Sequence, residues 1–207
     1  MLNIAVFGSG KGSNFQAILT SIQERRLKGA RVVLVVSNNS GAGILEIARS
    51  NNIPSLHMSR SQFVSEDDFI SAVLRTLTEH GADFIALAGY MKRLHPRIIR
   101  AYRNRIINIH PALLPKHGGH GMYGIHVHEA VIAAHERVSG ATVHVVDEEY
   151  DHGHVVLQRR VSVDPVDTPE SLAAKVLRLE HELYPEAIQL FAEGKVTFSD
   201  QEVVVQS

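Results

Sequence analysis

An amide and an imidazole lie two residues apart in a stretch of chain that otherwise looks buried. The segment 104–119 reads NRIINIHPALLPKHGG, and its isoleucines predict a strand that ends at His110. Side chains two positions apart on a strand point to the same face, so Asn108 and His110 project together. Because a buried face does not hold two polar groups without partners, this pair is a candidate for chemistry.

The chemistry that this pair could perform is activation of a carbonyl group. The amide nitrogen of Asn108 can donate to a developing oxyanion, and a protonated His110 can donate to the same oxygen or to a leaving nitrogen. An imidazole that is protonated near neutral pH needs a carboxylate neighbour, and Asp151 is our candidate for it. Spacing alone does not choose this acid over its neighbours, Asp147, Glu148 and Glu149. His110 could also be a hydrogen-bonded core histidine.

A loop of small residues, VFGSGKGSNFQ, joins the first predicted strand to the first predicted helix. Such a junction aims backbone N–H groups outward at a helix N-terminus, where they can bind phosphate. The dinucleotide motif fails because its third glycine is replaced by Ser13, and the triphosphate loop fails because Lys11 precedes Gly12. Two interpretations remain: a phosphate site with Ser13 and Asn14 as donors, or a tight turn with a serine cap.

The 13 histidines do not favour a metal site. His126 and His128 have the spacing of a strand chelate, but this segment is predicted to open a helix, where that spacing turns the rings apart. His152 and His154 share the spacing, and their role stays open. The sequence holds no His-Glu-x-x-His motif and no Gly-x-Ser-x-Gly elbow, so we predict no metal and no serine-hydrolase triad.

The composition suits one ordinary domain of 207 residues. A formal net charge of -1 gives no general attraction to nucleic acid or to an anionic membrane. No apolar run reaches the ~20 residues that a membrane span needs, and the N-terminus lacks the cationic start of a signal peptide. The absence of cysteine excludes disulfides and cysteine nucleophiles. We therefore expect a cytoplasmic protein without nucleic-acid or membrane partners.

Strands and helices alternate through the first half of the sequence, which predicts a parallel sheet. Strands are expected at 2–7, 31–36, 54–57, 84–88 and 105–110, with helices at 14–27, 43–51, 66–79 and 96–102. The second half is expected to hold a loop at 116–124, a helix at 126–136, strands at 141–146 and 154–163, a helix at 168–192 kinked by Pro185, and a tail strand or two after Gly194.

The predicted fold class is α/β: an open, mostly parallel twisted sheet of Rossmann-like type with helices on both faces and antiparallel strands toward the C-terminal half. We expect one domain over 1–207, with a phosphate-binding half at 1–110 and a second half at 111–207. The second half would carry the catalytic loop and cover the ligand.

Five segments occur in an order known from one enzyme family. They are GSGKGSN at 8–14, LAGYMKRL at 87–94, NIHPALLPKHGG at 108–119, EEYDHG at 148–153 and LEHELYP at 179–185. Together they run through nearly the whole chain, and they resemble the phosphoribosylglycinamide formyltransferase family of folate-dependent enzymes. The resemblance implies transfer of a formyl group from 10-formyltetrahydrofolate, as co-substrate, to the amine of glycinamide ribonucleotide in purine biosynthesis.

The resemblance also implies roles for residues of this sequence. Asn108 and His110 would bind the formyl oxygen, and Asp151 would keep His110 cationic. Glu180 would contact the ribosyl part of the substrate. The substrate phosphate would be held by Gly12, Ser13 and Asn14. The folate pocket would be lined by Met91, Lys92, Arg93 and Leu94, with Asn108.

Each of these roles has a plainer alternative. Met91 and Leu94 could be core, Lys92 and Arg93 could be a solvated loop, and Glu180 could be a helix-surface charge. The sequence also departs from the family in a longer loop at 117–124, in the two histidines around Gly153, and in Glu66 where some members use an arginine on the folate tail.

Three other functions are weighed against this resemblance. Methionyl-tRNA formyltransferase usually has a further RNA-binding domain, for which this chain is too short. Formyltetrahydrofolate deformylase uses water instead of the amine and normally carries an N-terminal regulatory domain, for which a strand starting at Leu2 leaves no room. A non-catalytic folate- or nucleotide-binding module is the third. We expect small-molecule substrates as partners and a monomer or homodimer.

Overall fold

The computed structural model describes residues 1–198 and 203–206. Its strands are β1 (Leu2–Phe7), β2 (Ala30–Ser37), β3 (Ser55–His57), β4 (Phe84–Leu87), β5 (Ile106–His110), β6 (Val138–Val145), β7 (Val155–Ser162), β8 (Val196–Phe198) and β9 (Val203–Val205). Its helices are α1 (Ser13–Gln23), α2 (Gly43–Ser50), α3 (Glu66–Glu79), α4 (Pro96–Ala101), α5 (Ile125–Ala133) and α6 (Pro169–Ala192), with a short 3-10 helix at Arg60–Gln62.

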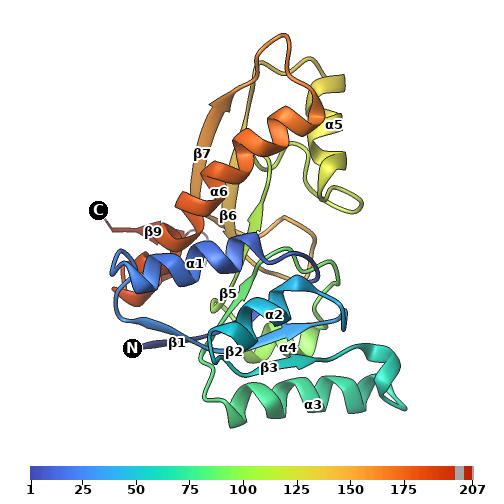
Figure 1. Cartoon of the computed structure of the whole chain (residues 1–207), viewed down its shortest axis with the longest axis vertical. Helices are drawn as coiled ribbons and strands as arrows, with labels where there is room; N and C mark the ends of the chain where they lie inside the picture. Colours follow the sequence, from blue (N-terminus) through green and yellow to red (C-terminus); the bar gives the residue numbers. More distant parts are fainter. Residues whose placement is uncertain (199–202, 207) are drawn as a thin grey trace. The chain divides into compact units, whose positions relative to one another are not determined.

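Seven strands form one sheet in the order β3-β2-β1-β4-β5-β6-β7, and β8 pairs with β9 in a small second sheet (Figure 1). β1 runs parallel to β2 and β4, and β2 runs parallel to β3. β6 and β7 are antiparallel. This arrangement confirms the predicted fold class, with a parallel part built from the first half of the chain and antiparallel strands toward the C-terminus.

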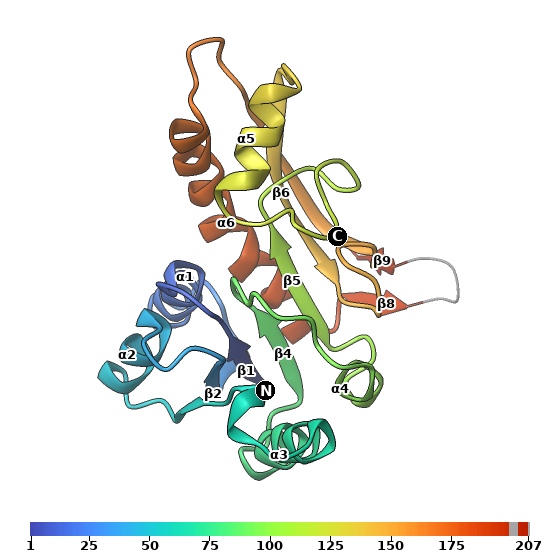
Figure 2. The ribbon, with the colours of Figure 1, turned by 90° about the vertical axis from the view of Figure 1, so that its right-hand side faces the viewer.

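The chain divides into two compact units, Met1–Ile107 and Asn108–Ser207, and the boundary falls inside β5. In the first unit, Figure 2 shows α1 and α2 on one side of β1, β2 and β4, with α3 and α4 on the other. In the second unit, α6 packs against β6, β7 and α5. The single domain expected over 1–207, with halves at 1–110 and 111–207, stays a prediction.

Each unit buries its own apolar side chains. In the first, β1 and β2 are covered on both faces, as parallel strands require, and Ile4, Val6 and Leu34 are 0% exposed. In the second, α6 buries one stripe of side chains at helical spacing, namely Leu172, Val176, Leu183, Ala187 and Ile188. Among the described residues, no helix is long and apolar enough to cross a membrane.

Two predicted helices extend beyond the observed ones, and in both cases a residue with a positive φ lies just after the observed end. The helix expected over 14–27 ends at Gln23, because Arg25 has a φ of 59°. The helix expected over 126–136 ends at Ala133, close to His135 with a φ of 52°. A left-handed residue closes a helix, and outside glycine it leaves little trace in a sequence. α6 continues through Pro185 to Ala192, and the kink there stays a prediction.

Candidate active site

β5 presents its polar side chains on one face, as strand alternation predicts. Ile107 and Ile109, at 0% and 6% exposure, belong to the other face. His110 is 3% exposed, and Asn108 is half-buried. The expected pairing of an amide and an imidazole at the end of this strand is therefore present.

Both nitrogen atoms of His110 face an oxygen. Nε2 donates a hydrogen bond to the backbone carbonyl oxygen of His117 at 2.8 Å. Nδ1 lies 3.6 Å from Oδ2 of Asp151, which also accepts a hydrogen bond from the backbone N–H of Gly119 at 2.9 Å. The neighbouring Asp147 instead contacts His152 at 3.0 Å. The acid beside His110 is therefore Asp151.

Burial and nearby groups act in opposite directions on the members of this pair. Burial lowers the pKa of His110, and Asp151, which acts in the opposite direction, does not reverse the shift. For Asp151, burial would raise the pKa, but hydrogen bonding, including that from the Gly119 N–H, brings it below its ordinary value. A lowered imidazole pKa favours the neutral ring, in which Nδ1 is a proton acceptor next to a carboxylate. The expectation that Asp151 keeps His110 cationic near neutral pH stays a prediction.

A fourth side chain, the buried His144 on β6, joins this cluster and was not predicted. Its Nε2 lies 3.1 Å from Nδ2 of Asn108 and 3.5 Å from Oδ1 of Asp151. The sequence did carry a signal, because a histidine in the buried run ATVHVV breaks the apolar pattern as Asn108 does in β5. Asn108, His110, His144 and Asp151 together form what we call the β5–β6 cluster.

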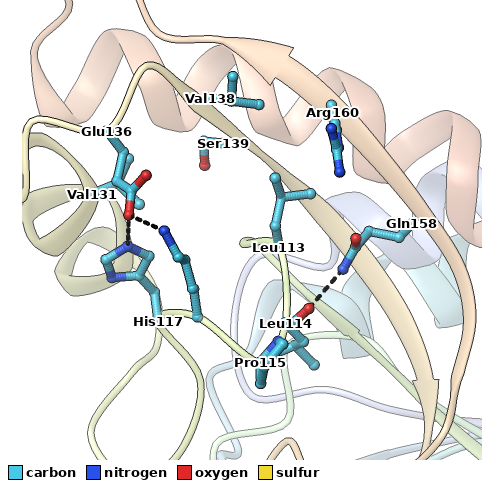
Figure 3. A pocket seen from close by; sticks show the side chains of 11 residues that line it. Leu113, Leu114, Pro115, His117, Val131, Glu136, Val138, Ser139, Gln158 and Arg160 are labelled. Atoms are coloured by element: carbon cyan, nitrogen blue, oxygen red, sulfur yellow. Dashed lines mark hydrogen bonds and ion pairs between the residues drawn. The ribbon is translucent and has the colours of Figure 1, made fainter.

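A cavity of about 350 Å³ in the second unit is lined in part by His117, whose backbone carbonyl oxygen accepts a hydrogen bond from His110 (Figure 3). Its walls include Leu113, Val131 and Val138, and Glu136 points toward His117. Glu136 Oε1 lies 2.7 Å from the Lys116 ammonium and 3.8 Å from Nε2 of His117. Glu136 thus lies beside His117, the residue whose carbonyl oxygen binds His110.

In the first unit, the glycine loop ends in a left-handed residue that starts α1. Gly12 has a φ of 84°, and a Cβ there would lie 2.8 Å from the Cα of Ile44. Among the described residues, no side chain caps this helix at its N-cap position, so the alternative of a serine cap is wrong. Ser13 is exposed, while Asn14 is 8% exposed. Phosphate binding by Gly12, Ser13 and Asn14 remains a prediction.

Ser9 connects this loop to the segment predicted to line the folate pocket. Its hydroxyl donates to Oδ1 of Asn38 and accepts a hydrogen bond from the backbone N–H of Met91 at 2.8 Å. Met91 is 46% exposed, so it is not core, whereas Leu94 is 5% exposed. The side chains of Lys92 and Arg93 are exposed. No motif in the sequence singles out Ser9.

The exposure of Glu180 and of the histidines outside the cluster separates the alternatives offered for them. Glu180 on α6 is 8% exposed, so it is not the surface charge offered as its alternative. On α5, His126 is exposed and His128 is buried, as a helix turns them apart. Across the described residues, no group of three or more His, Asp or Glu side chains is placed to hold a metal ion. His152 and His154 are both exposed.

The comparisons with known proteins agree with this fold. The chain matches the formyl transferase family over residues 2–188 and belongs to that family. The chloroplastic phosphoribosylglycinamide formyltransferase of Arabidopsis thaliana is 43% identical over 201 residues, which are 97% of this chain and 68% of the relative. The Bacillus subtilis phosphoribosylglycinamide formyltransferase is 36% identical over 91% of this chain and 94% of its own length.

Solved structures give the same fold. Glycinamide ribonucleotide transformylase 1 from Symbiobacterium toebii has a TM-score of 0.92 and 38% identity, covering 100% of this chain and 95% of that chain. A formyltetrahydrofolate deformylase from Pseudomonas syringae has a TM-score of 0.88 at 24% identity, covering 100% of this chain and 66% of that chain. At that identity the deformylase shares the fold, and nothing about activity follows from it.

Proposed function

We propose that this member of the formyl transferase family transfers a formyl group from 10-formyltetrahydrofolate to the amine of glycinamide ribonucleotide, a step of purine biosynthesis. The observation that carries the proposal is the β5–β6 cluster. In it, the Asn108 amide nitrogen lies 3.1 Å from Nε2 of His144, and the Asp151 carboxylate lies 3.5 Å from that nitrogen and 3.6 Å from Nδ1 of His110. The names of the relatives with 36–43% identity support the same substrates.

The chemistry proposed for the cluster is direct transfer through a tetrahedral oxyanion. The amine nitrogen bonds to the formyl carbon, and the carbonyl electron pair moves onto oxygen, where the Asn108 amide donates to it. The amine proton passes to Nδ1 of His110, and Asp151 stabilises the imidazolium that forms. The bond from carbon to the folate nitrogen then breaks, that nitrogen takes the proton, and tetrahydrofolate leaves.

Binding of the two substrates is proposed for residues outside the cluster. The uncapped N-terminus of α1, with Gly12, Ser13 and Asn14, suits the substrate phosphate, because backbone N–H groups and the helix dipole favour an anion there. The partly exposed segment Met91–Leu94 is proposed for the folate, and the buried Glu180 for the ribosyl hydroxyls.

Release of tetrahydrofolate from 10-formyltetrahydrofolate, measured with and without glycinamide ribonucleotide, tests the proposal. Release that requires the amine is expected. Release without the amine would instead indicate the deformylase reaction, and saturable folate binding without release would indicate a non-catalytic module. Both outcomes would overturn the transferase. We also keep as predictions a cytoplasmic location, small-molecule partners alone, no metal, and a monomer or homodimer.

A further inference from the structure

The ring of His144 has a hydrogen-bonding arrangement that determines its tautomer. Nδ1 lies 3.0 Å from the carbonyl oxygen of Val145. A carbonyl oxygen only accepts hydrogen bonds, so Nδ1 carries the hydrogen. In a neutral imidazole, Nε2 then holds a lone pair and can only accept.

This tautomer determines which atom of Asn108 faces the ring. Nε2 of His144 lies 3.1 Å from the Asn108 side-chain nitrogen, so that nitrogen donates one of its two hydrogens to the ring. The second amide hydrogen is then free for another acceptor. The reaction proposed above requires this second hydrogen at the formyl oxygen.

The opposite arrangement would remove the donor. With a hydrogen on Nε2, His144 would donate to Oδ1 of Asp151, at 3.5 Å, and Asn108 would have to turn its amide oxygen toward the ring. Donor and acceptor of the amide would exchange places. That arrangement would also leave a lone pair on Nδ1 facing the Val145 carbonyl oxygen at 3.0 Å, and 3.5 Å is long for a hydrogen bond to Asp151, so the geometry favours the Nδ1–H tautomer.

We propose that His144 is a positioning residue, which holds the Asn108 amide with its nitrogen toward the ring and so keeps one amide hydrogen available for the oxyanion. This inference rests on the proposed function. It adds a residue that does not itself touch the reacting atoms and acts through Asn108.

The first test does not depend on activity. In protein labelled with ¹⁵N at histidine, the ring nitrogen shifts of His144 at pH 7.5 are assigned by comparison with His144→Gln. An Nδ1–H tautomer is expected. An Nε2–H tautomer, or a doubly protonated ring, would overturn the proposal even if formyl transfer is confirmed. If formyl transfer fails while the Nδ1–H tautomer is found, the proposed function is at fault and the amide orientation stands.

The second test compares an accepting with a non-accepting replacement. Leucine fills the space without a lone pair, so His144→Leu should lower kcat by about 10²-fold, close to the loss of an oxyanion donor, with KM changed less than kcat. The amide oxygen of His144→Gln can accept from Asn108, so this variant should retain kcat to within about tenfold of the parent. Equal losses in both variants, with equal melting temperatures, would contradict a role through the lone pair.

The third test is a double-mutant cycle with Asn108→Ala. Since His144 acts through Asn108, adding His144→Leu to that variant should lower kcat by less than about twofold more. If the double variant lost kcat by the product of the two single-variant losses, His144 would act independently of Asn108, and the proposal would be overturned. If the leucine variant does not fold, the same cycle is measured with His144→Gln. The ring nitrogen shifts of His144 then test the tautomer independently.

Discussion

Nδ1 of His110 lies 3.6 Å from Oδ2 of Asp151, on a ring whose other nitrogen already donates to a backbone carbonyl oxygen. The ring is held in one orientation by the Nε2 bond, and Nδ1 is left as the basic atom. The carboxylate cannot be reached by a direct short hydrogen bond at this distance, but it stabilises any positive charge on the ring. When the ring is neutral, Nδ1 is therefore the atom of His110 that can take up a proton.

The acid side of the pH–rate profile should report this arrangement. In the proposed mechanism His110 acts in its neutral form, and burial lowers its pKa, so kcat/KM should be constant at neutral pH and fall at acid pH as the ring takes up a proton. Asp151→Asn removes an influence that raises this pKa, so the fall should move to still lower pH while the maximum rate drops. An acid limb above pH 6.5 would contradict a neutral His110.

Asn108→Ala should lower kcat by about 10²–10³-fold, because one preorganised donor to the oxyanion is lost. The half-buried side chain is small, so the melting temperature should change little. Steady-state kinetics with both substrates and a thermal melt measure the two effects. Turnover equal to that of the parent would exclude the proposed role of the amide.

Gly12→Ala should destabilise the first unit by about 2–4 kcal/mol, combining the cost of a left-handed non-glycine residue with overpacking. The reasons are a φ of 84° and a Cβ that would lie 2.8 Å from the Cα of Ile44. Gly10→Ala is the matched control, because a Cβ there meets none of the described residues within 4 Å. Urea unfolding should separate the two variants clearly, and equal stabilities would show that Gly12 is not needed for its backbone.

Ser9→Ala should raise KM for the formyl donor by roughly 2–10-fold with kcat nearly unchanged, since one or two hydrogen bonds of ordinary strength are lost. The affected bonds run to Asn38 and from the Met91 N–H, so the change loosens the segment proposed to bind folate. Ser40→Ala, an exposed serine of the same unit, should leave both constants unchanged. A kcat loss without a change in KM would place Ser9 in the chemistry instead.

The parts of the site that depend on strand alternation or on the order of strands and helices were predictable from the sequence. The alternation in β5 placed Asn108 and His110 on one face, and the order of strands and helices predicted the parallel sheet. The choice of Asp151 over its acidic neighbours was stated only as a candidate, because it depends on how a turn between two antiparallel strands folds back. Asp151 itself has a φ of 53°, which no periodicity indicates.

Other parts depend on contacts between distant segments or on backbone atoms. Ser9 meets Met91 across 82 residues, and His144 meets Asn108 across 36, so neither contact is visible in local spacing. The pKa of His110 depends on the fold for a related reason. Asp151 raises this pKa from a distant turn, but burial, which lowers it, is a property of the whole fold.

The loop at 117–124 serves the β5–β6 cluster through its main chain: the carbonyl oxygen of His117 binds His110, and the N–H of Gly119 binds Asp151. Both residues have positive φ, at 54° and 96°. Because these contacts come from backbone atoms, position 117 needs a residue that tolerates a left-handed backbone more than it needs an imidazole. Replacement of His117 by glycine or asparagine should therefore leave the reaction intact.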